Sequence, residues 1–420
     1  MVETDLVDKN KDAIGRRTWV STFGLLLALV SEGYDLQAAN FAAPAIVRSL
    51  GITKAQIGPL LSSSLVGVLL GAALIGPLGD RVGRKRLIIA GCMAYGLCSL
   101  VAASATTLQE LVLVRFLIGL GLGGVLPNAL ALTSELASRG SEATAAGFIG
   151  IGITLGGVFA GLAASILLVQ FGWQSIFLVG GVLPLLIVAL LLLILPESPA
   201  FLAARAQRAG RPALHSWLPG PGVLFHHELA LQTSAIWLTF AAILMCVYLL
   251  SGWIPLLLNQ SGFSASRAAL IGAAYHGGGV MGGITASLCL RRRGWDVVAI
   301  FAGLACVTMV FLVEAASSTA LLVAGVVGAG FFVTGTQNAI NGAGGVSYTP
   351  DIRSSGLGWA LGIGRLGSIA GPLVGSLAVV LGMKEARQLF ALPVLPLAVA
   401  VATALWLRRR ASFQWSQDQS

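Results

Sequence analysis

Residues 76–86 read Gly76-Pro77-Leu78-Gly79-Asp80-Arg81-Val82-Gly83-Arg84-Lys85-Arg86 and lie between apolar runs at 56–78 and 87–105. The glycines of this stretch permit a tight turn between two helices. Asp80 would then lie near the positive N-terminus of a helix, and Arg84 could pair with an acid at a helix end. The plainer alternative is a loop that is basic only because it faces the inside of a membrane.

The composition around this stretch is that of a polytopic membrane protein. Of the 420 residues, 56% are hydrophobic and 10% are charged, whereas about 25% are charged in a soluble domain. A membrane helix needs about 20 apolar residues, and this rule predicts an all-α membrane protein with twelve spans. The spans are 18–47, 56–78, 87–105, 108–136, 143–168, 173–195, 229–256, 265–289, 296–314, 318–345, 354–381 and 386–407.

Basic residues are unevenly distributed between the two sets of loops. If the N-terminus is inside, 19 of the 26 Lys and Arg residues fall in inside segments, and only Arg48, Lys54, Arg267, Lys384 and Arg387 fall outside. The asymmetry predicts a multi-pass inner-membrane protein with both termini in the cytoplasm. It also explains the net charge of +9 without a nucleic-acid partner. The first span is too long and too acidic for a signal peptide.

The chain shows no pattern typical of an enzyme or a metal site. Its five cysteines lie within or at the ends of predicted spans without metal-ligand spacing, and its four histidines form no His-x-x-x-His pattern. No Gly-rich nucleotide loop follows a strand. We therefore expect no enzyme activity, no metal and no cofactor, and transport driven by an ion gradient.

The two halves of the chain repeat each other. A shift of 211 residues places Gly67 and Gly71 on Gly278 and Gly282. The same shift places Gly147, Leu155, Gly156, Leu162 and Ser165 on Gly358, Leu366, Gly367, Leu373 and Ser376. Because six spans is an even number, the halves are parallel repeats. We predict an N-terminal six-helix bundle at 1–196, a proline-rich linker at 197–228 and a C-terminal six-helix bundle at 229–420.

Two acids, Glu32 and Asp35, lie inside the first span. A carboxylate near the bilayer centre costs about 2.5–3.5 kcal/mol even on insertion scales, so a function is the default explanation. Residues three apart share one helix face. The alternative is a pair that faces a water-filled vestibule and has no role.

Two arginines also lie inside spans. Arg365 is about 16 Å into the eleventh span, and a guanidinium fork matches a carboxylate, so it is either an anchor for an anionic substrate or half of an internal ion pair. Arg115, about eight residues into the fourth span, is also buried, and beside Glu32 or Asp35 it would favour the charged carboxylate while the dry surroundings favour the neutral one. The alternative is a static buried ion pair. Glu135 lies 20 residues beyond Arg115, about 30 Å along the helix, and is expected beside Arg84.

Polar and aromatic residues cluster in the second half. Gln337, Asn338 and Asn341 on the tenth span could read ring hydroxyls or form helix–helix hydrogen bonds. Tyr275 and His276 precede three glycines on the eighth span, where a histidine could relay protons. Tyr34 could stack on the ring of a ligand. The alternative for Tyr34, as for other buried aromatic residues, is ordinary packing.

The chain resembles the major facilitator superfamily over essentially its whole length. Residues 76–86 are similar to the loop motif of that superfamily, although the matching stretch of the second half, 288–294, lacks the aspartate. Within the superfamily, three passages resemble the aromatic acid:proton symporters, closest to the branch that imports 3-(3-hydroxyphenyl)propionate. They are residues 32–39, the fourth span from Arg115 through Pro127-Asn128 to Glu135, and residues 362–372.

The residues and the resemblance together give a set of expected roles. Proton coupling is expected of Glu32, Asp35 and Arg115. Substrate binding is expected of Arg365, Tyr34, Asn128, Gln337, Asn338, Asn341, Tyr275 and His276. Gating is expected of Gly79, Asp80, Arg84, Glu135 and Arg353.

The expected function is import of an aromatic carboxylic acid, of the 3-hydroxyphenylpropionate or hydroxybenzoate type, by proton symport with alternating access. Its partners would be that small molecule, protons and the lipid bilayer, and the protein would be a monomer. A proton-coupled exporter of organic compounds is the alternative within the same fold. A membrane sensor that binds but does not transport is a further alternative, which the short tails disfavour.

Overall fold

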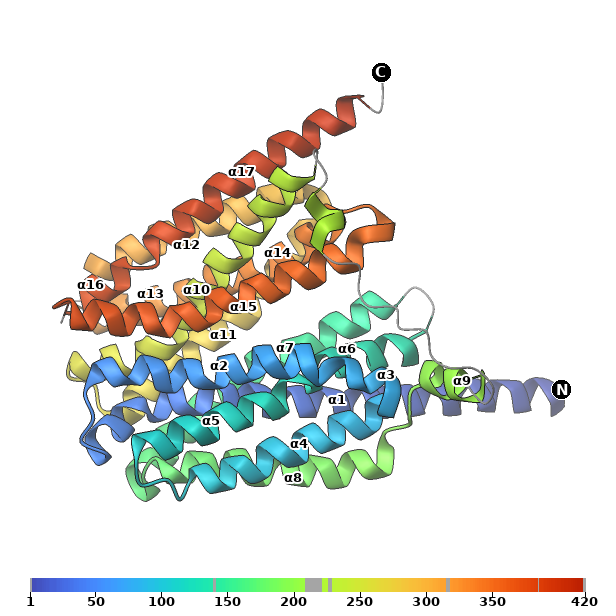
Figure 1. The fold of residues 1–420 in the computed structure, drawn as a ribbon, viewed down its shortest axis with the longest axis horizontal. Helices are drawn as coiled ribbons and strands as arrows, with labels where there is room; N and C mark the ends of the chain where they lie inside the picture. The colour runs from blue at the N-terminus through green and yellow to red at the C-terminus, as the bar shows by residue number, and fades with distance from the viewer. Residues whose placement is uncertain are drawn as a thin grey trace. The chain divides into compact units, whose positions relative to one another are not determined.

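The structure is a computed structural model that describes residues 2–138, 141–207, 221–225, 229–314, 318–383 and 385–417. In these ranges the chain is helical and contains no strand (Figure 1). The helices of the first half are α1 (Val2–Ser49), α2 (Ile57–Leu74), α3 (Gly79–Val82), α4 (Arg84–Ala102), α5 (Leu108–Gly123), α6 (Val125–Leu136), α7 (Glu142–Phe171), α8 (Gln174–Ile194) and α9 (Pro199–Gln207).

The second half continues in the same way. Its helices are α10 (Ala230–Gln260), α11 (Ala265–Arg293), α12 (Trp295–Glu314), α13 (Thr319–Ala329), α14 (Gly335–Val346), α15 (Pro350–Val380), α16 (Ala386–Ala391) and α17 (Val394–Gln417). Short 3₁₀ turns occur at Lys54–Gln56, Gly76–Leu78 and Pro221–Phe225, and a π-helix, η5 (Gly330–Thr334), joins α13 to α14.

These elements correspond to the twelve predicted spans. Ten of the described helical segments are long and apolar enough to cross a membrane. The other two predicted spans are α1 and α11, whose lengths of 48 and 29 residues would also cross a bilayer. The middle of each of these helices is less apolar than in the other spans, because α1 contains Glu32 and Asp35 and α11 contains His276 and several glycines. The helix α1 begins at Val2 rather than near residue 18, because the polar segment before the first span is helical as well.

Local signals explain where several helices begin and end. At the start of α5, the Thr107 hydroxyl accepts a hydrogen bond from the Glu110 N–H at 3.2 Å, and the Glu110 carboxylate accepts one from the Thr107 N–H at 3.2 Å. This reciprocal arrangement is a capping box. The loop of residues 76–86 turns at Gly83, whose φ of +109° is a conformation that favours glycine.

The contacts of the chain define two compact units. Unit 1 comprises Met1–Ala38, Val66–Ala160 and Phe171–Leu214, and unit 2 comprises Ala39–Leu65, Gly161–Gln170 and His215–Ser420. In unit 1, α4 packs against both α5 and α8, and in unit 2, α10 packs against α15 and α17 (Figure 1). The predicted division at the linker 197–228 stays a prediction, and residues 208–220 and 226–228 of that linker lie outside the described residues.

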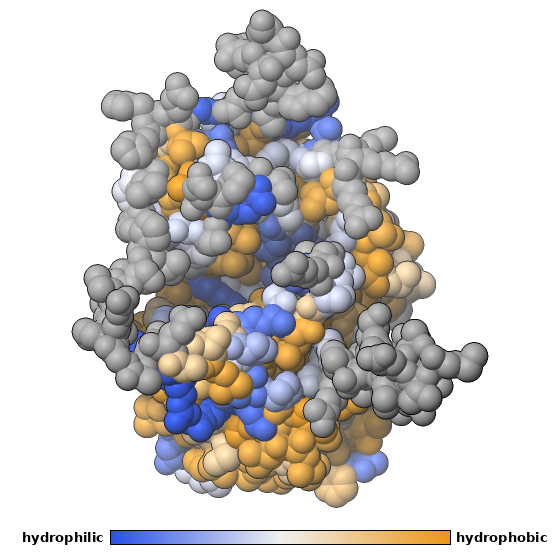
Figure 2. Space-filling view, turned by 90° about the vertical axis from the view of Figure 1, so that its right-hand side faces the viewer, coloured by the Kyte–Doolittle hydropathy of each residue, from blue (hydrophilic) through white to orange (hydrophobic). Residues whose placement is uncertain are grey.

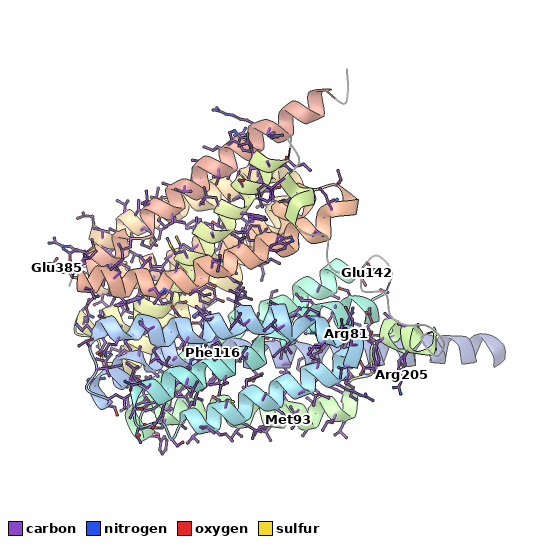
Figure 3. All side chains as sticks on the ribbon, in the orientation of Figure 1. Arg81, Met93, Phe116, Glu142, Arg205 and Glu385 are labelled. Carbon is purple, nitrogen blue, oxygen red and sulfur yellow. The ribbon has the colours of Figure 1, made fainter. Side chains whose placement is uncertain are left out.

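The outer surface is apolar, as a lipid environment requires. Large side chains are exposed in both units, among them Leu193 of α8 at 85% and Leu395 of α17 at 75%. Figure 2 shows hydrophobic residues over much of the visible surface. In Figure 3, Arg81, Glu142 and Arg205 gather at one end of unit 1, whereas Met93 and Phe116 lie along its length. These three charged residues therefore lie at one end of the spans of unit 1, and the two apolar ones lie along them.

The repeat seen in the sequence is a repeat of contacts. In unit 1, a Cβ on Gly67 would lie 2.2 Å from the Phe116 carbonyl oxygen, and in unit 2 a Cβ on Gly278 would lie 2.3 Å from that of Val327. Gly278 lies 211 residues after Gly67, and Val327 lies 211 residues after Phe116. The same holds for Gly156 against the Val30 carbonyl oxygen (2.1 Å) and Gly367 against that of Ala241 (2.0 Å). In each half, equivalent helices approach one another closely because the glycines between them have no side chain.

Candidate functional site

A buried ion pair occupies the interior of unit 1. Asp35 of α1 and Arg115 of α5 are 0% and 1% exposed, and Arg115 Nη1 lies 3.2 Å from Asp35 Oδ1. The same nitrogen donates to the Asp35 backbone carbonyl at 2.9 Å, and Nη2 donates to that of Leu36 at 3.5 Å. The guanidinium therefore holds both the carboxylate and the backbone of α1. Of the two acids expected beside Arg115, the structure places Asp35 against it.

The second oxygen of this carboxylate, Asp35 Oδ2, is buried and accepts no hydrogen bond from the described residues. Ser99 lies nearby, but its hydroxyl donates to the Phe177 carbonyl at 3.1 Å. A buried carboxylate oxygen without a donor is costly when the group is charged. That oxygen is therefore the place in this pair where a proton can be added.

Polar side chains surround the pair within unit 1. The Tyr34 hydroxyl donates to the Ile176 carbonyl at 3.2 Å, and the Tyr95 hydroxyl donates to Ser31 Oγ at 3.1 Å. Glu32 is 1% exposed on the same helix. The sequence reasoning did not include Ser31, Tyr95 or Ser99. The signal in the sequence that could have identified these three residues is that they are polar, lie within apolar spans and occupy positions that can face the acids.

A second charged cluster lies at the loop of residues 76–86. Arg84 Nη2 is 3.1 Å from Asp80 Oδ1, and Arg84 Nη1 forms an ion pair with Glu135 at the end of α6. The Ser198 hydroxyl donates to the other oxygen of Glu135. Three segments, α3–α4, α6 and the start of α9, are thereby tied together. The gating role of Arg84, Asp80 and Glu135 stays a prediction.

Glu197 connects the loop to the end of α8, and the expected roles did not include it. Its Oε1 accepts hydrogen bonds from the Lys85 N–H at 3.0 Å and the Ser198 N–H at 2.9 Å. A Cβ on Gly83 would lie 2.4 Å from Glu197 Oε2, so the turn glycine also makes room for this carboxylate. The signal for Glu197 in the sequence was that an acid follows the sixth span directly, in Pro196-Glu197-Ser198-Pro199.

Asn128 lies at the loop as well. Its Nδ2 donates to the carbonyls of Gly76 (3.1 Å) and Gly124 (2.8 Å), and its Oδ1 occupies the space where Gly79 has no Cβ. Asn128 is 13 residues beyond Arg115 in sequence, about 20 Å along a helix. This geometry favours a role in holding the loop, and the expected substrate contact of Asn128 stays a prediction.

In unit 2, Arg365 of α15 is half-buried, and its Nη1 donates to the Tyr248 hydroxyl of α10 at 3.4 Å. Nearby along α10, Trp253 Nε1 donates to the Pro372 carbonyl of α15 at 3.2 Å. A guanidinium beside a phenol, on a pair of closely packed helices, provides donors for a carboxylate. Arg353 lies in the first turn of α15 and is exposed. The expected gating role of Arg353 stays a prediction.

Aromatic and amide groups occupy other helices of unit 2. His276 is buried with edge-on contacts to Tyr275 (centroids 5.2 Å apart) and Phe41 (6.1 Å). Asn338 Nδ2 of α14 donates to the carbonyl of Thr334, the last residue of η5, at 3.0 Å, Gln337 is half-buried, and Asn341 is exposed. The structure thus assigns Asn338 a hydrogen bond to the residue four positions earlier in the same span. It leaves the side chains of Gln337 and Asn341 at least partly accessible.

The profile of the Major Facilitator Superfamily matches residues 25–344. The chain belongs to this superfamily. Superfamily transporters from several bacteria are similar to it over nearly their whole length. The 3-(3-hydroxy-phenyl)propionate transporter of Escherichia coli is 35% identical over 94% of this chain and 96% of its own. The 4-hydroxybenzoate transporter of Pseudomonas aeruginosa is 34% identical (94% and 94%), and the gallate transporter of Pseudomonas putida is 33% identical (94% and 93%).

Solved structures of other superfamily transporters share the fold. A D-xylose–proton symporter matches with a TM-score of 0.75 at 15% identity, over 93% of this chain and 97% of its own. A bacterial homologue of the human lysosomal transporter Spinster, in an inward-facing conformation, matches with a TM-score of 0.74 at 19% identity (94% and 97%). The predicted fold of twelve helices in two pseudo-symmetric six-helix bundles is confirmed, and this multi-pass membrane protein is a transporter rather than an enzyme.

One span of each half is interrupted, and the two interruptions lie at corresponding positions of the repeat. The helix α5 ends at Gly123, and α6 begins after Gly124. A shift of 211 residues carries 119–123 onto the π-helix Gly330–Thr334. Discontinuous helices at matching positions of two repeats are common in transporters, and single-turn π-helices occur frequently at functional sites. Arg115 lies about two turns before one interruption, and Gln337 lies just after the other.

Proposed function

We propose that the chain imports an aromatic carboxylate together with protons by alternating access. The observation that carries this proposal is the buried pair of unit 1, in which Arg115 holds one oxygen of Asp35 and the other oxygen accepts no hydrogen bond from the described residues. A carboxyl in such surroundings can alternate between charged and neutral forms, because the neighbouring guanidinium and the dry interior favour opposite protonation states. Glu32, three residues away on the same helix, provides a second candidate proton carrier.

The proposed substrate is a small carboxylic acid with a hydroxylated ring. The names of the similar transporters support this class, since each refers to a hydroxylated aromatic acid. In this chain, Arg365 with Tyr248 would bind the carboxylate. Tyr275, His276, Gln337 and Asn341 would contact the ring and its hydroxyl groups. Residue 154, the repeat counterpart of Arg365, is a threonine, so the anchor is present in one half only.

The driving force depends on how many protons accompany each anion. One proton per monoanion moves no net charge, so only the pH gradient contributes, at about 1.4 kcal/mol per pH unit. A second proton adds about 2.3 kcal/mol per 100 mV of membrane potential. Two acids on α1 make the second case possible. We place the protein in the inner membrane as a monomer that needs no cofactor beyond the proton gradient.

Uptake into right-side-out vesicles tests the proposal. Labelled 3-(3-hydroxyphenyl)propionate, 4-hydroxybenzoate and gallate are each supplied under an imposed inward proton gradient. We compare wild type with Asp35→Asn and with Glu314→Gln, an exposed acid at the end of α12 that serves as the matched control. Wild type and the control should accumulate at least one acid above equilibrium in a protonophore-sensitive way, and Asp35→Asn should not.

Other outcomes separate the alternatives. Accumulation of the acid in inverted vesicles only, driven by the opposite gradient, would identify an exporter. Uphill uptake that persists in Asp35→Asn at the wild-type level would contradict the proton role of Asp35. Binding of an acid without any uptake would identify a sensor.

A further inference from the structure

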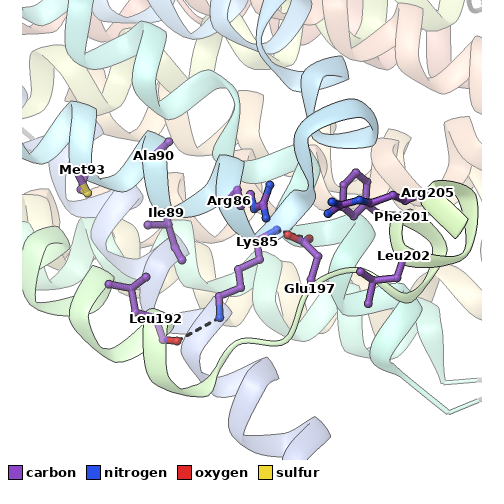
Figure 4. A pocket seen from close by; sticks show the side chains of 10 residues that line it. All are labelled: Lys85, Arg86, Ile89, Ala90, Met93, Leu192, Glu197, Phe201, Leu202 and Arg205. Atoms are coloured by element: carbon purple, nitrogen blue, oxygen red, sulfur yellow. Dashed lines mark hydrogen bonds between the residues drawn. The ribbon is translucent and has the colours of Figure 1, made fainter. Parts of the chain in front are cut away.

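A cavity of about 570 Å³ lies on unit 1, between the start of α4, the end of α8 and α9 (Figure 4). Its lining contains three cations, Lys85, Arg86 and Arg205, and one acid, Glu197. Three positive charges less one negative charge leave a net charge of +2. Glu197 is already engaged, because it accepts the N–H groups of Lys85 and Ser198. The free cationic donors therefore dominate the polar part of the cavity.

The rest of the lining is apolar. Ile89 and Met93 come from α4, Leu192 from α8 and Leu202 from α9. Met93, Leu192 and Leu202 are 44%, 55% and 51% exposed, so this wall is continuous with the outer surface. Eight residues of helix separate Lys85 from Met93, about 12 Å along α4. The cavity thus has a cationic end and an apolar groove that runs from it along the span.

The position of the cavity relative to the spans determines which of its lining residues face the polar layer of the bilayer and which face the hydrocarbon layer. One membrane span begins at Arg84, and another ends at Ile194. The cations therefore lie where a span meets the polar layer of the bilayer, and Met93 lies towards the hydrocarbon layer. Lys85 Nζ donates to the Leu192 carbonyl at 3.1 Å, which holds this ammonium over the groove (Figure 4). An ammonium has three protons, so two remain for another acceptor.

We propose that this cavity binds an anionic phospholipid of the bilayer. Its phosphate would contact Lys85, Arg86 and Arg205, and an acyl chain would lie along Ile89, Met93 and Leu192. Guanidinium and ammonium groups are the common phosphate ligands in proteins. A soluble phosphate would use only the cationic end, whereas the exposed apolar wall fits a lipid tail. This site is separate from the proposed transport site and does not depend on it.

Lipid binding to the purified full-length chain tests the proposal. Delipidated protein is titrated with phosphatidylglycerol and, separately, with phosphatidylcholine of the same acyl chains, and bound lipid is counted by native mass spectrometry. Wild type should retain phosphatidylglycerol preferentially. Because each basic residue near an anionic membrane contributes roughly fivefold in affinity, Arg86→Gln/Arg205→Gln should weaken its binding by about 25-fold.

The matched control is Arg48→Gln/Arg267→Gln, which removes two exposed cations from helix ends of unit 2. It should bind phosphatidylglycerol as wild type does. A photoactivatable phosphatidylglycerol should label peptides that contain residues 85–93 or 199–207 in wild type. Both double variants must elute as folded monodisperse protein, and Arg205→Gln alone, at an exposed position of α9, provides a milder second test with about a fivefold loss.

Three results would overturn the proposal. The first is equal binding of the two lipids by wild type. The second is equal weakening by the cavity variant and the control variant. The third is displacement of the lipid by an excess of inorganic phosphate, which would identify a site for a free anion. Because none of these measurements involves transport, failure of the lipid site and failure of the proposed symport are distinguishable.

Discussion

At the scale of single residues, the buried pair of Asp35 and Arg115 makes unit 1 sensitive to the loss of either partner. Both side chains are at most 1% exposed, and Arg115 also holds backbone carbonyls of α1. A buried pair contributes little net stability, because desolvation offsets the attraction between the charges. Removal of one partner is different, since it leaves the other charge buried and uncompensated.

The first prediction follows from this asymmetry. Asp35→Asn should lower the free energy of unfolding by about 3 kcal/mol. The double variant Asp35→Asn/Arg115→Gln should recover part of that loss, because no uncompensated charge remains. Thermal unfolding of the purified variants in detergent, with Glu314→Gln as the control, measures both effects. Equal loss in the single and double variants would show that the pair acts through packing alone.

The second prediction concerns Arg365 and rests on the proposed function. Arg365→Lys keeps the charge but loses the planar fork, so the KM for the transported aromatic acid should rise about tenfold. Tyr248→Phe removes one neutral hydrogen-bond partner and should raise the KM about threefold. The concentration dependence of initial uptake rates measures both. Arg387→Lys, at an exposed position of α16, is the control, and a similar change there would argue against an anchoring role for Arg365.

At the scale of helices, close packing depends on glycines that face backbone carbonyls. A Cβ at Gly156 or Gly367 would overlap with the carbonyl oxygens of Val30 and Ala241. Gly147 and Gly358 are repeat counterparts on the same two helices, α7 and α15, and a Cβ at either meets nothing within 4 Å. These four positions allow steric cost to be separated from the general effect of a Gly→Ala change.

The third prediction uses this set. Gly156→Ala and Gly367→Ala should each destabilise the protein by about 2 kcal/mol, because the helices must move apart. Gly147→Ala and Gly358→Ala should be neutral or stabilising by about 0.5 kcal/mol, since alanine favours the helix. Thermal stability and yield of folded protein measure the difference. A loss of similar size at all four positions would contradict the steric explanation.

The fourth prediction concerns the turn at Gly83. Gly83→Ala should cost more stability than Gly51→Ala, although both glycines have positive φ values of +109° and +63°. At Gly51 only the backbone conformation opposes alanine, at about 1–2 kcal/mol, because a Cβ meets nothing within 4 Å. At Gly83 the new Cβ would also displace Glu197 and its hydrogen bonds from the N–H groups of Lys85 and Ser198. Equal losses in the two variants would mean that Glu197 moves without cost.

Sequence patterns predicted the helices better than the contacts among their polar groups. Hydropathy located nearly all span boundaries, because burial in lipid imposes a fixed length on each helix. Helix length also placed Glu135 near Arg84. The partner of Arg115 could not be chosen between Glu32 and Asp35, since the choice depends on how α1 and α5 are rotated about their axes. Glu197 was not selected, because an acid just after a span is indistinguishable in sequence from an ordinary interfacial charge.

At the scale of the whole molecule, the fold and the charge distribution predict a topology. The segment that contains residues 76–86 and the C-terminus should both be cytoplasmic, and the turn Ala103–Thr107 between α4 and α5 should be outside. Green fluorescent protein fused after Ser420 should therefore fluoresce, and alkaline phosphatase inserted in residues 103–107 should be active. The reciprocal fusions are the controls. Activity of a phosphatase fused after Ser420 would reverse the proposed orientation.

The glycine contacts that recur 211 residues apart allow the chain to serve as its own reference. In a saturation mutagenesis experiment, the tolerance of each residue in the first half can be subtracted from that of its counterpart in the second. Positions such as Gly67 and Gly278, which meet the same carbonyl geometry, should cancel. Arg115 opposite Val326, and Arg365 opposite Thr154, should not. The differences in tolerance that remain after the subtraction would identify residues needed for transport rather than for folding, and one polypeptide would supply both sides of the comparison.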